Sequence, residues 1–155
     1  MKHKIRPLAL GVFTYKNQIL VHQGYDRIKK ENYYRPLGGG IEFGETGAEA
    51  LAREIQEELG QDIRDIHYLG TLENIFTFEG EQRHEIVLTY DATFVDPTIY
   101  QQTKIKGTEG RSVSFFATWM PLKDFSNGRG PLYPNGLYEL LTKKSLPSLV
   151  TALYR

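Results

Sequence analysis

Residues 39–61 read GGIEFGETGAEALAREIQEELGQ and combine an expected glycine-rich loop, a helical pattern and a cluster of carboxylates. Apolar residues recur in this stretch at helical spacing, so one face of a helix can pack on a core. These residues are Ala48, Leu51, Ala52, Ile55 and Leu59. The pattern predicts a helix that begins near Thr46 and ends at Gly60, because glycine commonly follows the last turn of a helix.

Three carboxylates lie on one face of this predicted helix, because Glu54, Glu57 and Glu58 are spaced at i, i+3 and i+4. Like charges at this spacing destabilise a helix by about 0.2–0.5 kcal/mol per pair. The acids in the last turn also oppose the helix dipole, and Arg53 offsets only part of that cost. A solvated acidic face is one interpretation. Clustered oxygen ligands on a rigid helix also suit a hard cation such as Mg²⁺ or Mn²⁺.

The spacing of the fixed residues resembles the Nudix box, Gly-x5-Glu-x7-Arg-Glu-U-x-Glu-Glu-x-Gly-U, where U is a bulky apolar residue. The matching positions are Gly39, Glu45, Arg53, Glu54, Ile55, Glu57, Glu58 and Gly60. Only the last position departs, where Gln61 replaces the apolar residue, and this touches no charged position. The resemblance implies an α+β fold, an α/β/α sandwich with a central mixed sheet, in a single domain over residues 1–155.

The resemblance also implies roles for residues of the box. Glu54, Glu57 and Glu58 would be metal ligands, and Gly39 could add a backbone carbonyl. Arg53 would orient the carboxylates by charge-assisted hydrogen bonds. Glu45 would support the geometry between loop and helix. The expected cofactor is Mg²⁺ or Mn²⁺, because such ions neutralise phosphate oxygens and lower the pKa of bound water.

The general base has two candidates, since members of this family use either a box glutamate or a carboxylate from a later loop. Glu54 is the candidate within the box. Glu109 is the later one, in a loop over residues 107–110 that precedes the strand leading to Trp119. An ordinary loop acid is the alternative interpretation of Glu109, and Glu85 is a weaker candidate for the same role.

Residues beside the box are candidates for binding substrate. Tyr33, Tyr34 and Arg35 precede the glycines and could stack on a base or contact a phosphate, although aromatic residues near a loop are more often packing. An arginine close to a diphosphate gains bidentate hydrogen bonds. Gly38 and Gly40 extend the glycine run, which lets the backbone approach metal and phosphates closely.

The composition limits the class of protein. The chain has 155 residues, and its 19 basic residues equal its 19 acidic residues in number. A strongly basic surface for nucleic acid is therefore unsupported. The absence of cysteine excludes disulfides and thiolate sites, and argues against isopentenyl diphosphate isomerases, relatives whose chemistry uses a cysteine. No apolar run approaches a membrane span. We expect a cytoplasmic protein with a small-molecule partner. The sequence leaves the oligomeric state open, and the family resemblance makes a homodimer one option, because Nudix domains are often dimers.

Elements outside the box are expected mostly as strands, which with one early and one late helix gives an α+β class. Strands are expected over 5–14, 18–23, 33–37, 84–94 and 112–119, with a further short strand at 41–43. Loops are expected over 24–32 and 96–110, and strand-like segments with a break at Glu73–Asn74 over 63–78. A helix is expected over 135–142, and a short third helix or a frayed end from Pro147.

The expected activity is metal-dependent hydrolysis of a phosphoanhydride bond in a nucleoside diphosphate linked to another moiety. Sequence marks of the subgroups for ADP-ribose, diadenosine polyphosphates, NADH and coenzyme A are absent. Nucleoside triphosphates, including oxidised ones, and nucleotide sugars stay open. A non-catalytic nucleotide-binding or sensor domain is the alternative, for which erosion of the box acids would be expected. A structural domain that binds Ca²⁺ without turnover is a third class. The intact acids favour the enzyme.

Overall fold

The computed structural model describes residues 3–110, 113–126 and 130–143. Its strands are β1 (Ile5–Val12), β2 (Thr14–Tyr15), β3 (Gln18–Asp26), β4 (Glu31–Arg35), β5 (Leu37–Gly40), β6 (Ile63–Phe78), β7 (Glu81–Phe94), β8 (Lys104–Glu109) and β9 (Val113–Pro121). Its helices are α1 (Gly47–Leu59) and α2 (Leu137–Thr142), with the 3-10 helices η1 (Pro97–Gln101) and η2 (Leu122–Phe125).

The strands form two sheets. The first has the order β5-β1-β7-β6, and the second has the order β2-β3-β9-β8, with β4 paired to β3. Strand β1 runs parallel to β7 and antiparallel to β5, so the first sheet is mixed. The second sheet is antiparallel throughout its pairs. This arrangement confirms the α+β class and the mixed sheet.

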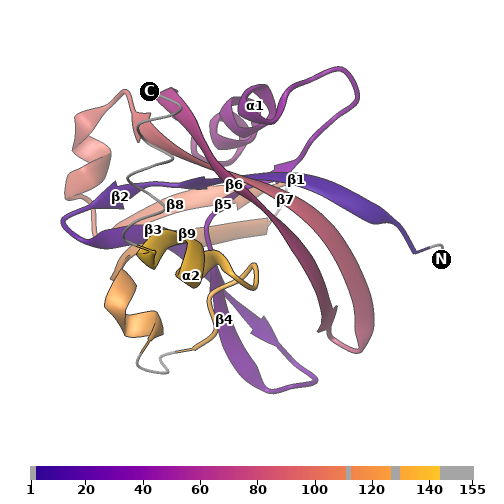
Figure 1. Ribbon diagram of the computed structural model, residues 1–155. Helices are drawn as coiled ribbons and strands as arrows, with labels where there is room; N and C mark the ends of the chain where they lie inside the picture. The colour runs from indigo at the N-terminus through magenta and orange to yellow at the C-terminus, as the bar shows by residue number, and fades with distance from the viewer. Residues whose placement is uncertain (1–2, 111–112, 127–129, 144–155) are drawn as a thin grey trace.

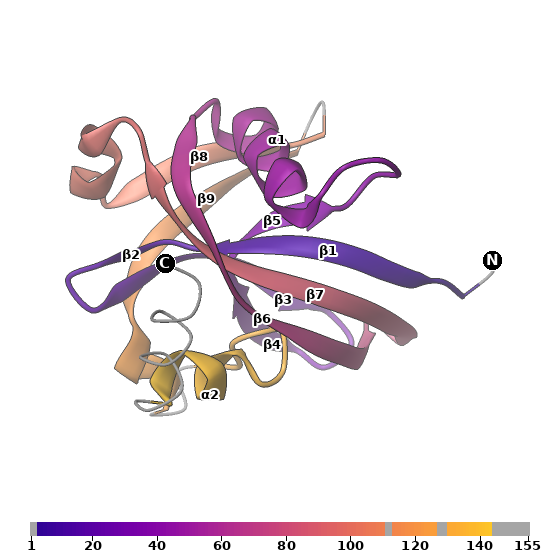
Figure 2. The same ribbon diagram turned by 45° about the horizontal axis from the view of Figure 1, so that its top comes forward.

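Helices α1 and α2 lie on opposite sides of the strands (Figures 1 and 2). Successive side chains of a strand point to opposite faces, so one strand can serve both sides. In β1, Ala9 belongs to the core cluster that contains Leu51 and Ile55 of α1. Val12 belongs instead to the cluster that contains Leu137 of α2. The strands thus lie between two helical layers, as the family resemblance implies.

Both ends of α1 lie where the sequence predicts them. The Thr46 side chain accepts from the Glu49 N–H, and the Glu49 side chain accepts from the Thr46 N–H, which forms a capping box. Gly60 ends the helix in the left-handed region at φ 65°. In the described part of the chain, no helix has both the length and the apolar character needed to cross a membrane.

The glycine run forms a strand rather than the expected loop. Residues 38–40 belong to β5, which pairs with β1 in the register Leu8↔Gly40, Ala9↔Gly39 and Leu10↔Gly38. A Cβ on Gly38, which has φ 149°, would meet the Ala9 carbonyl oxygen. The strand expected over 41–43 is wrong, since these residues follow the end of β5 and lead into a turn over 42–45, in which the Glu45 N–H donates to the Glu42 carbonyl.

Three further expectations about elements are corrected. Polar residues over 24–32 extend β3 and begin β4, and Asp26 accepts the Ile28 and Lys29 N–H groups in the turn between them. Strand β6 has no break at Glu73–Asn74, because Asn74 keeps its ladder position opposite Glu85. Residues 96–110 contain η1 and β8, which pairs with β9 although only alternate residues of β8 are buried. The helix expected from Pro147 lies outside the described residues.

Candidate functional site

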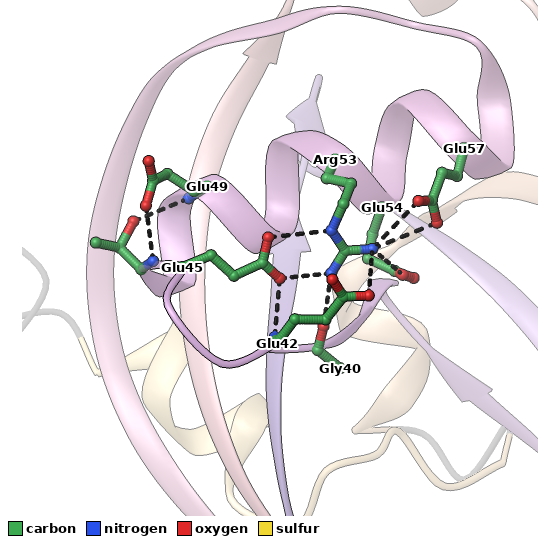
Figure 3. Close-up of polar contacts among 8 residues, drawn as sticks. Gly40, Glu42, Glu45, Glu49, Arg53, Glu54 and Glu57 are labelled. Carbon is green, nitrogen blue, oxygen red and sulfur yellow. Dashed lines mark hydrogen bonds and ion pairs between the residues drawn. The ribbon is translucent and has the colours of Figure 1, made fainter.

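Arg53 joins α1 to the turn that precedes it (Figure 3). Its guanidinium donates to both carboxylate oxygens of Glu45, and the Nε–Oε2 distance is 3.1 Å. Nη2 also donates to the Gly40 carbonyl oxygen at 2.9 Å, and Nη1 lies 3.3 Å from carboxylate oxygens of both Glu54 and Glu57. The hydrogen bonds from Arg53 lower the pKa of Glu45, and the Glu45 carboxylate raises the pKa of Arg53. The guanidinium therefore stays charged and fixes these groups relative to one another.

Gly39 lies directly against Glu54. A Cβ built on Gly39 would collide with the Glu54 carboxylate group, so any residue larger than glycine would displace it. Burial raises the pKa of Glu54, against the opposing effect of Arg53. The contact brings the β5 backbone to the acidic face of α1.

Glu58 has a different environment from its neighbour Glu57. In the described part of the chain, Glu58 Oε1 is buried and has no hydrogen-bond partner. Burial, followed by the charges of Glu54 and Glu109, raises the pKa of Glu58 to about 8. Glu57 is 59% exposed and lies on Arg53. The helix spacing predicts one acidic face, and the structure divides that face into a buried end and an exposed end.

Glu58 lines a cavity of about 170 Å³, which we call the Glu58 cavity. Backbone and side chains from β1, β3, β4, β5, β8 and β9 complete its lining: Arg6, Leu8, His22, Tyr33, Arg35, Pro36, Leu37, Gly38, Gly39, Glu109 and Phe115. A carboxylate with an unpaired oxygen thus shares one cavity with a guanidinium and the glycine backbone. That combination suits an anion held through a cation.

A second cavity of about 180 Å³ adjoins the first, since Arg6, Tyr33, Arg35 and Glu109 line both. We call it the aromatic cavity. Its further lining comes mainly from β6 and β7 and from the segment before α2: Asp26, Lys29, Glu31, Asn74, Phe76, Thr77, Phe78, Arg83, Glu85, Tyr133 and Pro134. The two cavities give the site one acidic end and one aromatic end.

Strand alternation separates the candidates that precede the glycines. Tyr33 and Arg35 line both cavities, whereas Tyr34 is 7% exposed and packs in the core cluster of Val12 and Leu137. Neighbouring residues of a strand point to opposite faces, so Tyr34 cannot share the direction of Tyr33. The Tyr34 ring contacts the Phe125 ring at a centroid distance of 5.6 Å.

The two later acids lie in different places. Glu109, at the end of β8, is exposed and lines both cavities, and its charge acts on Glu58. Glu85 is 3% exposed and lines only the aromatic cavity, so it lies away from the Glu58 end. Glu109 is therefore the later acid that the structure brings to the box.

Several lining residues were not anticipated from the sequence. His22 pairs with Arg35 across β3 and β4, and burial lowers its pKa, followed by the effect of Arg35. Arg6 and Arg83 reach the cavities from β1 and β7. No local motif marks any of these residues, and only the pairing of β3 with β4 and of β1 with β7 brings them to the site.

The residues present fit a divalent cation by the chemistry of their donors. Carboxylate oxygens and a backbone carbonyl are the ligands that hard cations prefer, and the oxygen of Glu58 is without a partner among the described residues. No three acidic or histidine side chains in the described ranges form a ready-made metal cage. Ligation by all of Glu54, Glu57 and Glu58 would require Glu57 to turn away from Arg53, which holds it at 3.3 Å.

Parts of the sequence are similar to known proteins. NAD-capped RNA hydrolase NudC of Mycobacterium bovis (strain BCG / Pasteur 1173P2) is 41% identical over 59 residues, which cover 34% of this chain and 19% of that protein. NAD-capped RNA hydrolase NudC of Vibrio parahaemolyticus is 29% identical over 94 residues, which cover 61% of this chain and 35% of that protein. The matches thus span 19% and 35% of the lengths of these curated relatives.

Solved structures share the fold. A MutT NUDIX hydrolase from Burkholderia pseudomallei aligns with a TM-score of 0.57 at 18% identity, over 78% of this chain and 86% of that one. The MutT protein from Bacillus halodurans aligns with a TM-score of 0.58 at 17% identity, over 88% of this chain and 80% of that one. The model of the NUDIX domain matches residues 5–141, which is most of the sequence. The chain therefore belongs to the NUDIX domain family.

Proposed function

We propose that this protein hydrolyses a phosphoanhydride bond in a nucleoside diphosphate linked to another moiety, such as a nucleoside triphosphate or a nucleotide sugar. The observation that carries the proposal is the Glu58 cavity. There, a buried carboxylate oxygen without a partner among the described residues meets Arg35 and the backbone of Gly38 and Gly39. Membership in a family whose hydrolases generally use divalent metals supports the same activity.

The metal ligands in this proposal are Glu54, Glu57, Glu58 and the Gly39 carbonyl. Mg²⁺ or Mn²⁺ held there would neutralise phosphate oxygens and make a bound water more acidic. Arg53 is a positioning residue, because its guanidinium contacts Glu54 and Glu57 and is itself fixed by Glu45. Glu45 supports the turn as well, since it accepts the Glu42 N–H at 2.9 Å.

Substrate phosphates would lie between the glycine backbone and Arg35. A guanidinium offers paired donors that match phosphate oxygens, and Arg35 lines both cavities. Gly38 and Gly40 flank the Gly39 contact and would shape the same surface. Of the two tyrosines, we assign Tyr33 to the substrate because it lines both cavities, and Tyr34 to packing because it is buried in a core cluster.

Two acids stay candidates for the general base. Glu54 lies against Gly39, and burial raises its pKa, which favours acceptance of a proton. Glu109 is exposed and lines both cavities, so its carboxylate is accessible to a water molecule held there. In either case the base takes the proton from the attacking water while the phosphoanhydride oxygen leaves with the departing group.

A phosphate-release assay tests the proposal. Triphosphates, ADP-ribose, nucleotide sugars, dinucleoside polyphosphates, NAD and NAD-capped RNA would be incubated with Mg²⁺ or excess chelator. NAD and NAD-capped RNA are included because two similar proteins are named NAD-capped RNA hydrolase. A coupled phosphatase or pyrophosphatase reports cleavage. We expect turnover of one class with Mg²⁺ and none with chelator, and the Glu58→Gln variant serves as the matched control for contaminating activity.

Binding without cleavage would support the alternative, a nucleotide-binding or sensor domain. If no compound of the panel is cleaved and calorimetry still shows nucleotide binding, the proposed hydrolase activity is wrong. The cytoplasmic location, the single-domain organisation and the homodimer stay predictions.

A further inference from the structure

The floor of the aromatic cavity carries two buried polar side chains. Asn74 of β6 and Glu85 of β7 are direct cross-strand partners, so their side chains lie on the same face of the sheet. Asn74 is 2% exposed and Glu85 is 3% exposed, and both line the cavity. Buried polar groups are costly unless they find hydrogen-bond partners. Such a pair at the base of a cavity therefore points to a polar ligand.

The hydrogen-bonding capacity of this pair is only partly used. In the described part of the chain, the Asn74 bond to the Asn135 N–H occupies Oδ1 at 3.4 Å and leaves the amide nitrogen available. Glu85 has one ion pair there, with Arg6 at 3.8 Å, and the Arg6 side chain is 54% exposed. A carboxylate can accept several hydrogen bonds at once. The floor thus offers N–H donors from Asn74 beside acceptor oxygens from Glu85.

Aromatic rings stand nearer the mouth of the same cavity. Phe76 and Phe78 follow Asn74 at alternate positions of β6, so all three face the cavity. The Tyr133 ring stacks on Phe76 at a centroid distance of 6.2 Å, and the Tyr33 ring meets Phe78 edge-on at 5.8 Å. A dry cavity of about 150 Å³ holds benzene. The aromatic cavity, at about 180 Å³, therefore holds one aromatic ring, and because it adjoins the Glu58 cavity of about 170 Å³, a bicyclic base has room with its polar edge at the floor.

We propose that the aromatic cavity binds the base of the substrate and selects guanine through Glu85 and Asn74, an inference that rests on the proposed function. Guanine presents two adjacent donors, N1–H and N2–H, that match one carboxylate, and an O6 acceptor beside them that matches an amide donor. Adenine and cytosine lack the paired donors. Uracil places a carbonyl on each side of its single donor, which a carboxylate repels. Because the cavities adjoin, the diphosphate of such a nucleotide would extend towards Glu58.

The test measures the affinity of GMP, IMP, AMP and UMP by calorimetry with Mg²⁺ present. Monophosphates contain no phosphoanhydride bond, so affinity is read without turnover. IMP lacks only the 2-amino group of GMP and removes one hydrogen bond to Glu85. We expect GMP to bind roughly tenfold tighter than IMP and about a hundredfold tighter than AMP or UMP. Equal affinities, or no measurable binding of GMP, would overturn the inference.

Two variants add a test of the named residues. Glu85→Gln keeps the shape and replaces one acceptor oxygen by an amide, so it should weaken GMP at least about tenfold and change AMP less than about twofold. Asn74→Asp should also weaken GMP, because it sets a carboxylate against O6. Thermal melting checks that each variant folds. If neither variant folds, the affinities of the unaltered protein for GMP and IMP still test the guanine site.

Failure of this inference is distinguishable from failure of the hydrolase. Preference for GMP without cleavage of any conjugate would leave the guanine site standing and remove the hydrolase. Cleavage of conjugates with equal kcat/KM for every base would keep the hydrolase and remove the guanine site.

Discussion

Replacing Glu58 by glutamine should stabilise the metal-free protein above neutral pH. Burial raises the pKa of this carboxyl from 4.5 to about 8. Between these values the folded protein keeps a proton that the unfolded chain has released. The carboxyl therefore contributes stability that is fully present below about pH 4.5 and is lost as the pH rises to about 8. Glutamine carries no charge, so the Glu58→Gln variant does not lose this contribution to stability between pH 4.5 and 8.

The size of the effect follows from the shift in pKa. At 1.36 kcal/mol for each pKa unit, the loss in the unaltered protein is at most about 5 kcal/mol. Solvent reaches this partly exposed side chain and reduces the figure to about 2–4 kcal/mol. Glu58→Gln should therefore be more stable than the unaltered protein by about 2–4 kcal/mol at pH 9 and equal within about 1 kcal/mol at pH 4.5.

Urea denaturation with excess chelator, from pH 4.5 to 9, measures both free energies of unfolding. The matched control is Glu57→Gln, which makes the same change of charge one residue away. The Glu57 side chain is 59% exposed, so this variant should change stability by less than about 1 kcal/mol. Parallel curves for Glu58→Gln and the unaltered protein would show that partial burial does not raise the pKa of the Glu58 carboxyl.

Three further predictions concern turnover on the substrate that the panel identifies. Gly39→Ala should lower kcat at least about tenfold, because the added Cβ displaces the Glu54 carboxylate. The control is Gly40→Ala, whose Cβ meets no atom closer than 4.0 Å and which should therefore lower kcat several-fold less. Equal losses of kcat in the two variants would contradict the contact between Gly39 and Glu54. Glu54→Gln and Glu109→Gln would be compared at saturating Mg²⁺. The variant that lacks the general base should have a kcat at least about a hundredfold lower than the unaltered protein. Wild-type kcat in Glu109→Gln would exclude that acid. Arg35→Lys should raise KM more than it lowers kcat, since lysine loses the bidentate geometry, and an unchanged KM in steady-state kinetics would remove Arg35 from the phosphates.

The helix of the candidate site was predictable because its signals are local. Apolar spacing and a terminal glycine at Gly60 act within one turn or two of the residues that they fix. Helix α1 consequently begins one residue after Thr46 and ends directly before Gly60, close to the prediction. The mixed sheet and the two helical layers followed from the family resemblance rather than from such local signals.

The unequal environments of the box acids could not be predicted from spacing. Helical geometry places Glu57 and Glu58 on one face, but Arg53 holds Glu57 at the surface and the β5 and β8 segments bury Glu58. Burial of this kind depends on strands that are distant in the sequence. The raised pKa of Glu58 becomes visible only when those strands are in place.

Polar strands were the main source of error in the fold. Residues 24–32 and 104–109 lack apolar runs, and their strands are stabilised by pairing with β3 and β9 instead of by their own burial. The aromatic cavity was missed for a related reason, since Phe76 and Tyr133 meet through tertiary packing alone. The sequence alone does not show whether Tyr33 or Tyr34 faces the cavities, because that depends on which face of β4 packs on the core.

The proposed metal site on α1 is tested by measuring the hydrolysis rate as a function of free Mg²⁺ for the unaltered protein and for Glu57→Gln. We expect saturable dependence on Mg²⁺, no turnover in excess chelator, and for Glu57→Gln a kcat at least about a hundredfold lower with a higher Mg²⁺ requirement. Turnover in excess chelator, or Mg²⁺ curves that coincide for the two proteins, would contradict a metal site on the acidic face of α1.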